Sequence, residues 1–250
     1  MSLKKIFFVL AILLPLSLLS QDNIETDRPT ESQSAELVDK KTFQLETGFR
    51  KQQENKEDYV LHHPEALLRY GLLKRLELRL AVNATSERLY SEDEFNYGLE
   101  PIEIGLKARV FQTKDTSFIT TLYTQLGVAK WAAKDHQLDE SFYRLRLLFQ
   151  NKLTEKIKLS YNVGRDWDSN NKEQMWIYTI APQFELSEKW HAFLEEFGSF
   201  TKGHTPEHYV DGGFSFFVTN NIELDVNAGK GISSNAADYF FTGGISFRIK

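Results

Sequence analysis

The chain contains no cysteine among its 250 residues. It therefore cannot form a disulfide, a thiolate metal site or a cysteine nucleophile, and it lacks the cysteine that carries the lipid of a bacterial lipoprotein. It also has no GxSxG motif and no glycine-rich phosphate loop, because the paired glycines at 212–213 and 243–244 lie inside predicted strands. These absences exclude several common kinds of catalytic and nucleotide-binding site.

Basic clusters and long apolar runs are scarce as well. The formal net charge is −5, and no run of lysine and arginine is available to neutralise phosphates, so we expect no nucleic-acid partner. A bundle of membrane helices would need several apolar runs of about 20 residues. Only one stretch approaches that length, so the sequence excludes a helical bundle although 41% of its residues are hydrophobic.

That single apolar run, Ile6–Leu19, follows two lysines and ends at the small residue Ser20. A basic start, a short apolar region and a small residue are typical of a secretory signal peptide. The run has about 14 residues and contains Pro15, which disfavours the alternative of a permanent membrane anchor. We predict that residues 1–20 are a signal peptide cleaved after Ser20.

The stretch Leu67–Asn83 carries the pattern on which the fold prediction depends. Apolar and polar residues alternate along its second half, a period of two that fits a strand and not a helix. The apolar face consists of Leu76, Leu78, Leu80 and Val82, and the polar face of Glu77, Arg79, Ala81 and Asn83. The alternation recurs about a dozen times before the C-terminus, with short and long connections in turn. This rhythm is the sequence signature of an outer-membrane β-barrel.

We therefore predict an all-β fold, a transmembrane antiparallel up-and-down barrel of about 12 strands within residues 42–250. An even number of strands returns both termini to the periplasm, and the short connections become periplasmic turns. Ten tyrosines and four tryptophans suit aromatic girdles at the two membrane interfaces. A secreted soluble β-sandwich is the alternative. The expected strands span residues 42–51, 59–72, 76–86, 101–112, 117–129, 141–152, 156–166, 174–186, 190–202, 207–219, 221–230 and 239–250.

Charged side chains are concentrated on the polar faces of these strands. An Arg or Lys against hydrocarbon at the bilayer midplane costs about 2–4 kcal/mol, so we expect these side chains to line the lumen and to form an internal salt-bridge ladder. The candidates are Glu46, Arg50, Glu65, Arg69, Glu77, Arg79, Glu103, Lys107, Arg109, Arg144, Arg146, Lys158, Glu195, Asp211, Glu223 and Asp225.

Three features break the regular pattern. Either Glu195 or Glu196 must face outward if the alternation is continuous, so we expect a bulge or a position at headgroup level there. Pro64 and Pro182 lie at outward positions and each removes a donor from the hydrogen-bond ladder, for which we also expect bulges. The strand at 117–129 alternates too poorly to show which of its faces points inward.

Residues 21–41 form a polar segment with almost no apolar period, which we call the leader. One interpretation is a disordered extended segment before the first strand. The other is that the leader folds into the periplasmic mouth of the barrel and pairs Asp27 and Arg28 with charges of the lumen.

The six histidines give no clear catalytic or metal site. His62 and His63 are adjacent on a strand and point to opposite faces, so they cannot hold one ion together. An outer-membrane hydrolase would need an outward His beside a Ser, oriented by a third polar group. His191 lies toward the periplasmic turns without an outward Ser partner. We predict no catalytic residue, no metal and no cofactor.

The segment ETDRPTES and the later HPEALLRYGLLKRLEL resemble the outer-membrane β-barrel transporter family named for the meta-pathway of phenol degradation. The resemblance implies a small barrel in the outer membrane of a Gram-negative cell and a role in the passage of small molecules. Nothing in the sequence supports phenol as the solute. The resemblance is carried by Thr26 to Thr30, by Pro64, Glu65, Arg69, Tyr70, Gly71, Arg75 and Glu77, and more weakly by Ala181, Pro182 and Glu195.

The function that we predict is a channel or transporter for small polar or amphipathic solutes, not an enzyme. Its expected partners are outer-membrane lipid, a small-molecule solute and the outer-membrane assembly machinery. Two alternatives stay open: a closed structural or interaction barrel whose lumen is filled by ion pairs, and, more remotely, the outer-membrane hydrolase. If the barrel conducts, Arg144 and Arg146 facing carboxylates of neighbouring walls would set its selectivity.

Overall fold

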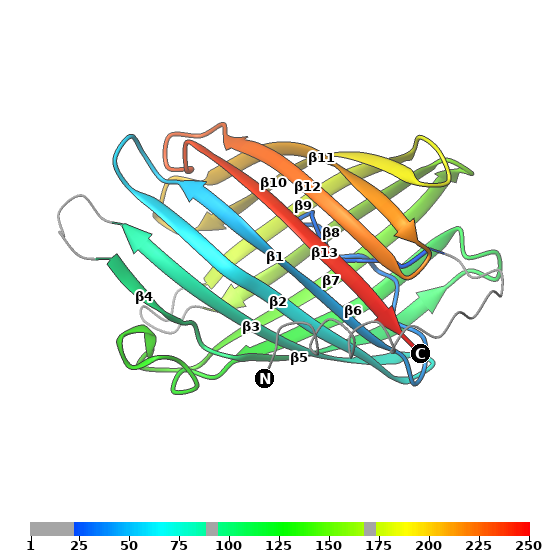
Figure 1. The fold of residues 1–250 in the computed structure, drawn as a ribbon, viewed down its shortest axis with the longest axis horizontal. Coiled ribbons are helices and arrows are strands. Elements are labelled where there is room, and N and C mark those ends of the chain that lie inside the picture. Colours follow the sequence, from blue (N-terminus) through cyan, green and yellow to red (C-terminus); the bar gives the residue numbers. More distant parts are fainter. Residues whose placement is uncertain (1–22, 89–94, 168–173) are drawn as a thin grey trace, which may run out of the picture.

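The computed structural model describes residues 23–88, 95–167 and 174–250, which form a closed antiparallel barrel (Figure 1). The predicted signal peptide, residues 1–20, lies outside the described residues. The strands are β1 Phe43–Gln53, β2 Tyr59–Leu73, β3 Leu76–Arg88, β4 Phe95–Leu99, β5 Glu103–Gln112, β6 Phe118–Gly127, β7 Phe142–Thr154, β8 Ile157–Trp167, β9 Gln174–Glu185, β10 Trp190–Thr201, β11 Glu207–Thr219, β12 Ile222–Gly231 and β13 Tyr239–Ile249, and one short 3₁₀ helix, η1, spans Lys134–His136.

The barrel closes by pairing its first and last strands. β1 pairs with β13 over its whole length, from Phe43 opposite Ile249 to Gln53 opposite Tyr239. β4 and β5 both pair with β3, β4 along Ala84–Arg88 and β5 along Leu76–Ala81, so together they occupy one position in the wall. The wall therefore has the twelve strand positions predicted, and closure leaves no edge strand between β1 and β13.

The structure corrects the prediction at β4. These five residues were expected to lie in the long loop 87–100, and the next strand was expected to begin at residue 101 rather than at Glu103. β4 ends just before Glu100 and Pro101, and a proline without an N–H favours a break in a strand. Phe95, Tyr97 and Leu99 do alternate with Asn96 and Gly98, but five residues are too short a run to stand out from a loop, and the pairing of β4 with β3 identifies it as a strand.

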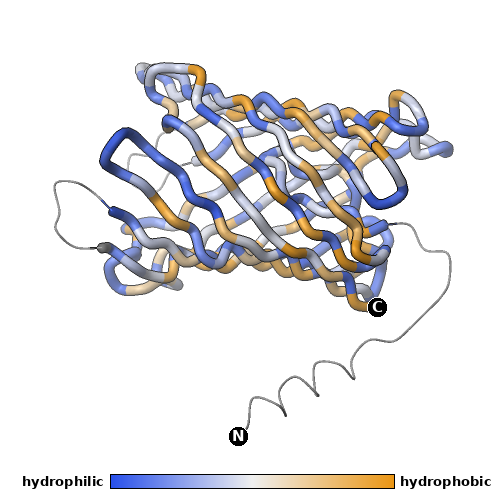
Figure 2. The backbone as a smooth tube through the Cα atoms, turned by 45° about the horizontal axis from the view of Figure 1, so that its top comes forward, coloured by the Kyte–Doolittle hydropathy of each residue, from blue (hydrophilic) through white to orange (hydrophobic). Residues whose placement is uncertain are grey.

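The outward faces are apolar and the inward faces polar, as the alternation predicts. Leu194 and Val226 are 60% and 56% exposed, whereas the adjacent Glu195 and Asp225 are only 4% and 3% exposed. Hydrophobic and hydrophilic residues alternate along the strands (Figure 2), and many of the large hydrophobic residues are exposed. A soluble sandwich would cover these side chains with a second sheet, so that alternative is wrong.

β6 is the strand whose inward face could not be predicted from the sequence. Its side chains Ile119, Tyr123 and Gln125 point inward, and each of them is at most 6% exposed. Ile119 and Tyr123 pack with Leu148 of β7 and with Ala35 of the leader in a small apolar cluster. Alternation failed here because this strand carries large apolar residues on its inner face, where they contact a segment distant in the sequence.

The predicted bulges are only partly present. The pairing of β2 with β3 shifts register between His62 and Glu65, which confirms the bulge at Pro64. The bulge predicted at Pro182 is wrong: Pro182 keeps its place opposite Leu159 in an unshifted β8–β9 ladder. No register shift occurs along β10 either.

Glu195 and Glu196 satisfy the alternation without a bulge. Glu195 points inward, while Glu196 is exposed on the outer face and accepts a hydrogen bond from the Tyr178 hydroxyl at 3.0 Å. Glu196 is the seventh of the twelve residues of β10, so the expected bulge is absent, and the position at headgroup level stays a prediction.

Short and long connections alternate, as predicted. The short ones lie at residues 74–75, 113–117, 155–156, 186–189 and 220–221. All of them, together with the start of β1 and the C-terminus, lie at one end of the barrel, which we call the short-turn end (Figure 1). The longer connections lie at the opposite, long-loop end.

Candidate functional site

The described part of the leader, residues 23–41, lies inside the barrel, with both of its ends at the short-turn end. The backbone N–H of Ile24 donates to the carbonyl of Asn220, in the turn between β11 and β12, at 2.8 Å. At the other end of the leader, Lys40 forms an isolated bridge with Gly71, and the Lys41 N–H donates to the Gly71 carbonyl at 2.7 Å. Of the two interpretations of residues 21–41, the structure has the one in which the leader contacts charges of the lumen.

Between these ends the leader follows the inner wall. The Glu31 and Ser32 N–H groups donate to Glu195 of β10, at 2.8 and 2.6 Å, and the Gln33 N–H donates to Asn162 of β8 at 2.7 Å. The chain then passes β7, β6 and β5. These later contacts are Ser34 to Gln150, Ala35 to Thr121 and Glu36 to Arg109. The leader therefore crosses the lumen in a ring of contacts rather than as a straight thread.

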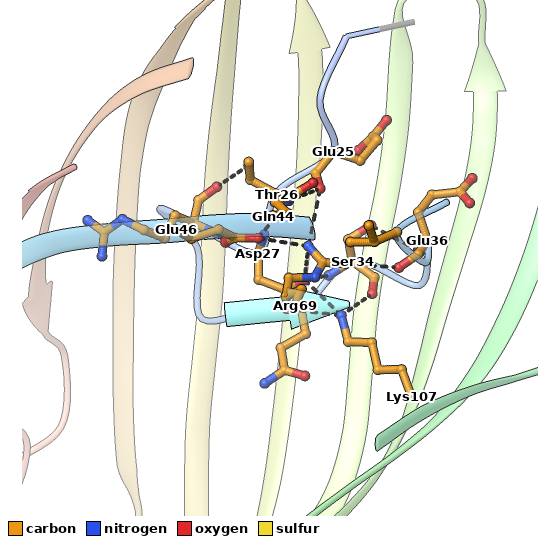
Figure 3. Close-up of polar contacts among 12 residues, drawn as sticks. Glu25, Thr26, Asp27, Ser34, Glu36, Gln44, Glu46, Arg69 and Lys107 are labelled. Carbon is orange, nitrogen blue, oxygen red and sulfur yellow. Dashed lines mark hydrogen bonds and ion pairs between the residues drawn. The ribbon is translucent and has the colours of Figure 1, made fainter. Parts of the chain in front are cut away.

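Asp27 is the centre of the densest contacts (Figure 3). Its carboxylate accepts from Arg79 Nη2 at 2.6 Å and from Lys107 Nζ at 2.8 Å, and Arg69 Nη1 lies 3.8 Å away. Burial alone would raise the pKa of the Asp27 carboxyl, but the three cations outweigh burial and hold that pKa well below its ordinary value. Asp27 is therefore ionised inside the barrel.

Arg69 joins the leader to two wall carboxylates. It is fully buried, and it donates to Glu46 at 2.8 Å and to Glu77 at 2.8 Å. These carboxylates also hold the leader backbone, because Glu46 accepts from the N–H of Asp27 at 2.9 Å and Glu77 from that of Val38 at 2.8 Å. Three wall cations thus meet three carboxylates, one from the leader and two from the wall.

Arg28 lies on the other side of the leader, against β12 and β2. Its guanidinium contacts Asp225 at 3.1 Å and Glu65 at 3.0 Å. The two wall glycines beneath it, Gly48 and Gly244, face each other in the β1–β13 register, and a Cβ at either would overlap the guanidinium. Glycine is needed at these positions because the arginine lies directly on the wall.

The remaining predicted lumen residues are also paired. Leader carboxylates contact wall cations in three cases, namely Glu25 with Lys158, Glu31 with Arg50 and Glu36 with Arg109. Wall residues contact each other in the pairs of Arg144 with Glu103 and of Arg146 with Asp166. Three buried carboxylates are held by neutral donors: Glu195 by the leader backbone, Asp211 by Asn227, and Glu223 by Ser215 and Thr26.

Sequence reasoning missed several members of this network. Asp166 has the same parity as Lys158 along the strand predicted at 156–166, so alternation alone could have identified it as inward. Glu25, Glu31 and Glu36 lie in the aperiodic leader, where no pattern indicates which residues enter the lumen. Their partners are at least 19 residues away in the sequence.

A cavity of about 500 Å³ lies beside the leader. The leader forms part of its lining through residues 27–31 and Gln33, and its walls come from β1, β2, β3, β5, β6, β7 and β13. Gln52 and His62, near the long-loop ends of their strands, also line it. The lumen therefore combines a leader held against the wall with an open, strongly charged space.

The histidines give no metal site within the described part of the chain. Within residues 23–88, 95–167 and 174–250, no three His, Cys, Asp or Glu side chains converge so that they could hold an ion. His62 lines the cavity 3.8 Å from Glu100, while His63 is exposed and stacks on Tyr97. The two rings occupy opposite faces, as predicted.

The structure corrects the expectation that no outward histidine has a serine partner. His63 Nε2 lies 2.8 Å from Ser86 Oγ on the outer wall, so an outward histidine does have a serine partner. The sequence did not reveal it because the bulge at Pro64 alters the pairing of β2 with β3. Among the described residues no carboxylate or amide side chain hydrogen-bonds His63, so the third group of a catalytic triad is not present there.

Comparison with known proteins identifies a matching family. The model of the family described as "Putative MetA-pathway of phenol degradation" matches residues 26–249. No curated protein sequence matches the chain. No helix in the described part of the chain has the length and apolar character needed to cross a membrane.

Solved structures share the fold at low sequence identity. An outer membrane channel from Pseudomonas putida F1 has a TM-score of 0.68 at 10% identity, covering 90% of this chain and 100% of that one. The NanC porin has a TM-score of 0.56 at 7% identity, covering 83% and 100%. The KdgM porin, solved with disordered oligogalacturonate, has a TM-score of 0.55 at 10% identity, covering 82% and 99%. The chain thus has the fold of outer-membrane channels and porins.

Proposed function

This chain belongs to the family whose description names the MetA pathway of phenol degradation, and on that premise we propose that it is an outer-membrane channel for small polar or amphipathic solutes. In this proposal residues 1–20 direct export and are removed, and both termini of the mature barrel face the periplasm. The outward apolar side chains contact lipid, and the assembly machinery of the outer membrane inserts the barrel.

The observation that carries the proposal is the contrast between the two surfaces of one wall. The outer surface is apolar, while the inner surface holds arginines, carboxylates and a cavity of about 500 Å³. A wall that needed only to be stable would be filled by apolar side chains, because buried ion pairs contribute little net stability. An ionic interior beside an open space is what a path for polar solutes requires.

The leader would narrow this path and give it selectivity. It lies in the part of the lumen next to the short-turn end, so a solute entering from the long-loop end reaches the cavity first. Arg144 and Arg146 line that cavity, and their partners Glu103 and Asp166 lie on the neighbouring walls. A solute would therefore pass groups of both signs before it reaches the leader.

A closed structural barrel is the second candidate, and the leader favours it. Ion pairs and hydrogen bonds join the leader to strands all around the lumen, and this would occlude a barrel whose leader never moved. Such a protein would use its long loops, including the exposed Trp131, as an interaction surface.

Planar-bilayer conductance separates the two candidates. We expect the purified full-length barrel to conduct ions, and the double variant Arg144→Ala and Arg146→Ala to shift its ion preference toward cations. Arg165→Ala is the matched control, because Arg165 on β8 lies opposite Leu145, the neighbour of Arg144, but packs outward on Trp167 and Trp176. A barrel that inserts, shows no conductance as wild type and begins to leak only as the double variant is a closed scaffold.

A further inference from the structure

The cavity beside the leader has features of a binding site as well as those of a passage. Its volume of about 500 Å³ falls within the range of about 300–1,000 Å³ that is usual for small-molecule pockets. An aromatic cluster fills the lumen beside the cavity, where Tyr209 and Phe240 pack with Phe197 and with Ala237 of the connection to β13, and the guanidinium of the lining residue Arg50 lies 4.2 Å from the centre of the Phe240 ring. A solute in this part of the lumen is therefore directed to one side.

Several residues that line the cavity have a buried polar side-chain atom without a protein partner among the described residues. They are Gln33 Oε1, Arg50 Nε, Arg79 Nε and Thr242 Oγ1. Arg79 and Thr242 are only 4% and 7% exposed. Buried polar atoms are almost always hydrogen-bonded in folded proteins, so these residues have unused hydrogen-bonding capacity next to the cavity.

The charges of the lining select the class of ligand. Arginines and carboxylates line the cavity in nearly equal number, so it has no strong preference for a simple anion or a simple cation. The two signs are nevertheless separated at the accessible positions. The side chain of Arg144 on β7 is 30% exposed, while those of Glu65 on β2 and of Glu100, in the connection between β4 and β5, are 28% and 31% exposed.

Each of these groups keeps capacity for a ligand. Arg144 contacts Glu103 and Asp166, but a guanidinium has five N–H donors and its fork geometry matches a carboxylate. Glu65 contacts Arg28 through Oε2. Glu100 is hydrogen-bonded by the Asn83 side chain and lies 3.8 Å from His62, and a carboxylate can accept further hydrogen bonds. A carboxylate therefore fits near Arg144 and an ammonium group near Glu65 and Glu100.

We infer that the cavity binds a small zwitterion, of amino-acid or dipeptide size, with its carboxylate at Arg144 and its ammonium group at Glu100. A simple anion would bind Arg144 but would be repelled by the carboxylates of the lining. A simple cation would be repelled by the arginines. Only a solute with separated charges gains both contacts. This inference names the solute class of the proposed channel. That the zwitterion is transported rests on the proposed function, whereas its binding in the cavity does not.

Calorimetric titration of the folded full-length barrel in detergent tests the inference with three probes of similar size. Glycylglycine carries both charges, N-acetylglycylglycine only the negative one, and glycylglycine amide only the positive one. We expect glycylglycine to bind at least tenfold more tightly than either of the others. Equal affinity for all three, tighter binding of the acetylated anion, or no saturable binding would overturn the inference.

Variants assign the two ends of the solute. Arg144→Gln should reduce the affinity for glycylglycine to that for the amide without weakening the binding of the amide, and Arg144→Lys should restore part of the loss. Glu100→Gln should reduce the affinity for glycylglycine to the affinity for N-acetylglycylglycine. The outward-facing Arg165→Gln and Glu196→Gln are the matched controls and should change nothing. Losses of equal size for every probe would mean that Arg144 only maintains the wall, and would overturn its assignment.

Conductance of the same preparation separates this inference from the proposed function. A barrel that conducts but does not prefer the zwitterion retains the channel and loses the inferred site. A barrel that prefers the zwitterion without conducting retains the site and loses the channel. Heat-modifiable migration on a gel verifies that each variant is folded before either measurement.

Discussion

The guanidinium of Arg28 lies directly against the backbone of Gly244, at a position where any side chain on the wall would overlap it. The relationship joins residues more than 200 positions apart in the sequence, one in an aperiodic leader and one in the last strand. Because the guanidinium lies against this backbone, it contacts both Asp225 and Glu65. The glycine is thus part of the surface that receives the leader.

Gly244→Ala should therefore loosen the leader while the barrel stays folded. The added methyl group occupies the place of the Arg28 side chain and also lies 2.7 Å from the Thr47 carbonyl oxygen, so β1 must shift slightly and the contacts of Arg28 with Asp225 and Glu65 must lengthen or break. We expect at least a tenfold faster cleavage of the folded protein by a glutamate-specific protease after Glu31 or Glu36. Gly243→Ala is the control, because a Cβ there meets only the edge of the Phe49 ring at 3.1 Å. Equal cleavage rates in the two variants would contradict the assigned role of Gly244.

The contact of Asp27 with Lys107 predicts a strong and non-additive effect on stability. Asp27→Asn leaves three buried cations facing only two carboxylates, and breaking a buried pair on one side costs about 3–5 kcal/mol. Lys107→Gln in the same chain restores the balance of charge. We expect the double variant to lose less stability than the sum of the single variants, by about 1–3 kcal/mol in urea unfolding followed by tryptophan fluorescence. Simple additivity would show that the two groups do not interact.

The same carboxylate predicts the direction of the pH dependence. The pKa of Asp27 is lowered in the folded protein because the cations outweigh burial, and the pKa of Glu31 is lowered in the same way by Arg50. A lowered folded pKa means that the unfolded chain binds the proton first, so the contribution to stability is complete above about pH 4 and declines as the pH falls below that value. Unfolding of the wild type should therefore become easier between about pH 4 and pH 2. Asp27→Asn should make the free energy of unfolding less dependent on pH in this range. An unchanged slope would contradict the assigned role of Asp27.

Lipid contact of the outer face predicts a dependence on depth. Val226 lies near the middle of β12 and is 56% exposed, whereas Ile249 is the last residue of β13 and 61% exposed. Val226→Arg should destabilise the barrel in lipid vesicles by about 2–4 kcal/mol, and Ile249→Arg by about 0–1 kcal/mol. Reversible unfolding from vesicles measures both. Equal costs at two positions of similar exposure would mean that exposure, not membrane depth, sets the penalty.

The strand positions could be predicted from the sequence because alternation is a local property. Leu76, Leu78 and Leu80 identify the outer face of β3 without any knowledge of its neighbours. The inward charges follow from the same pattern, and so does the number of positions in the wall. The facing of β6 could not be predicted, because its inward Ile119 and Tyr123 pack on a leader residue, Ala35, that no periodicity marks.

What the sequence by itself determined is therefore which side chains share a face, since neighbouring residues on an extended strand must point to opposite sides. Tertiary structure decided which charges meet. Asp27 finds Arg79 and Lys107 only because barrel closure brings β3 and β5 around the leader, and His63 finds Ser86 only because a bulge shifts β2. Ion pairs depend on distances of a few ångströms between groups far apart in the chain, and those distances exist only after the wall has closed.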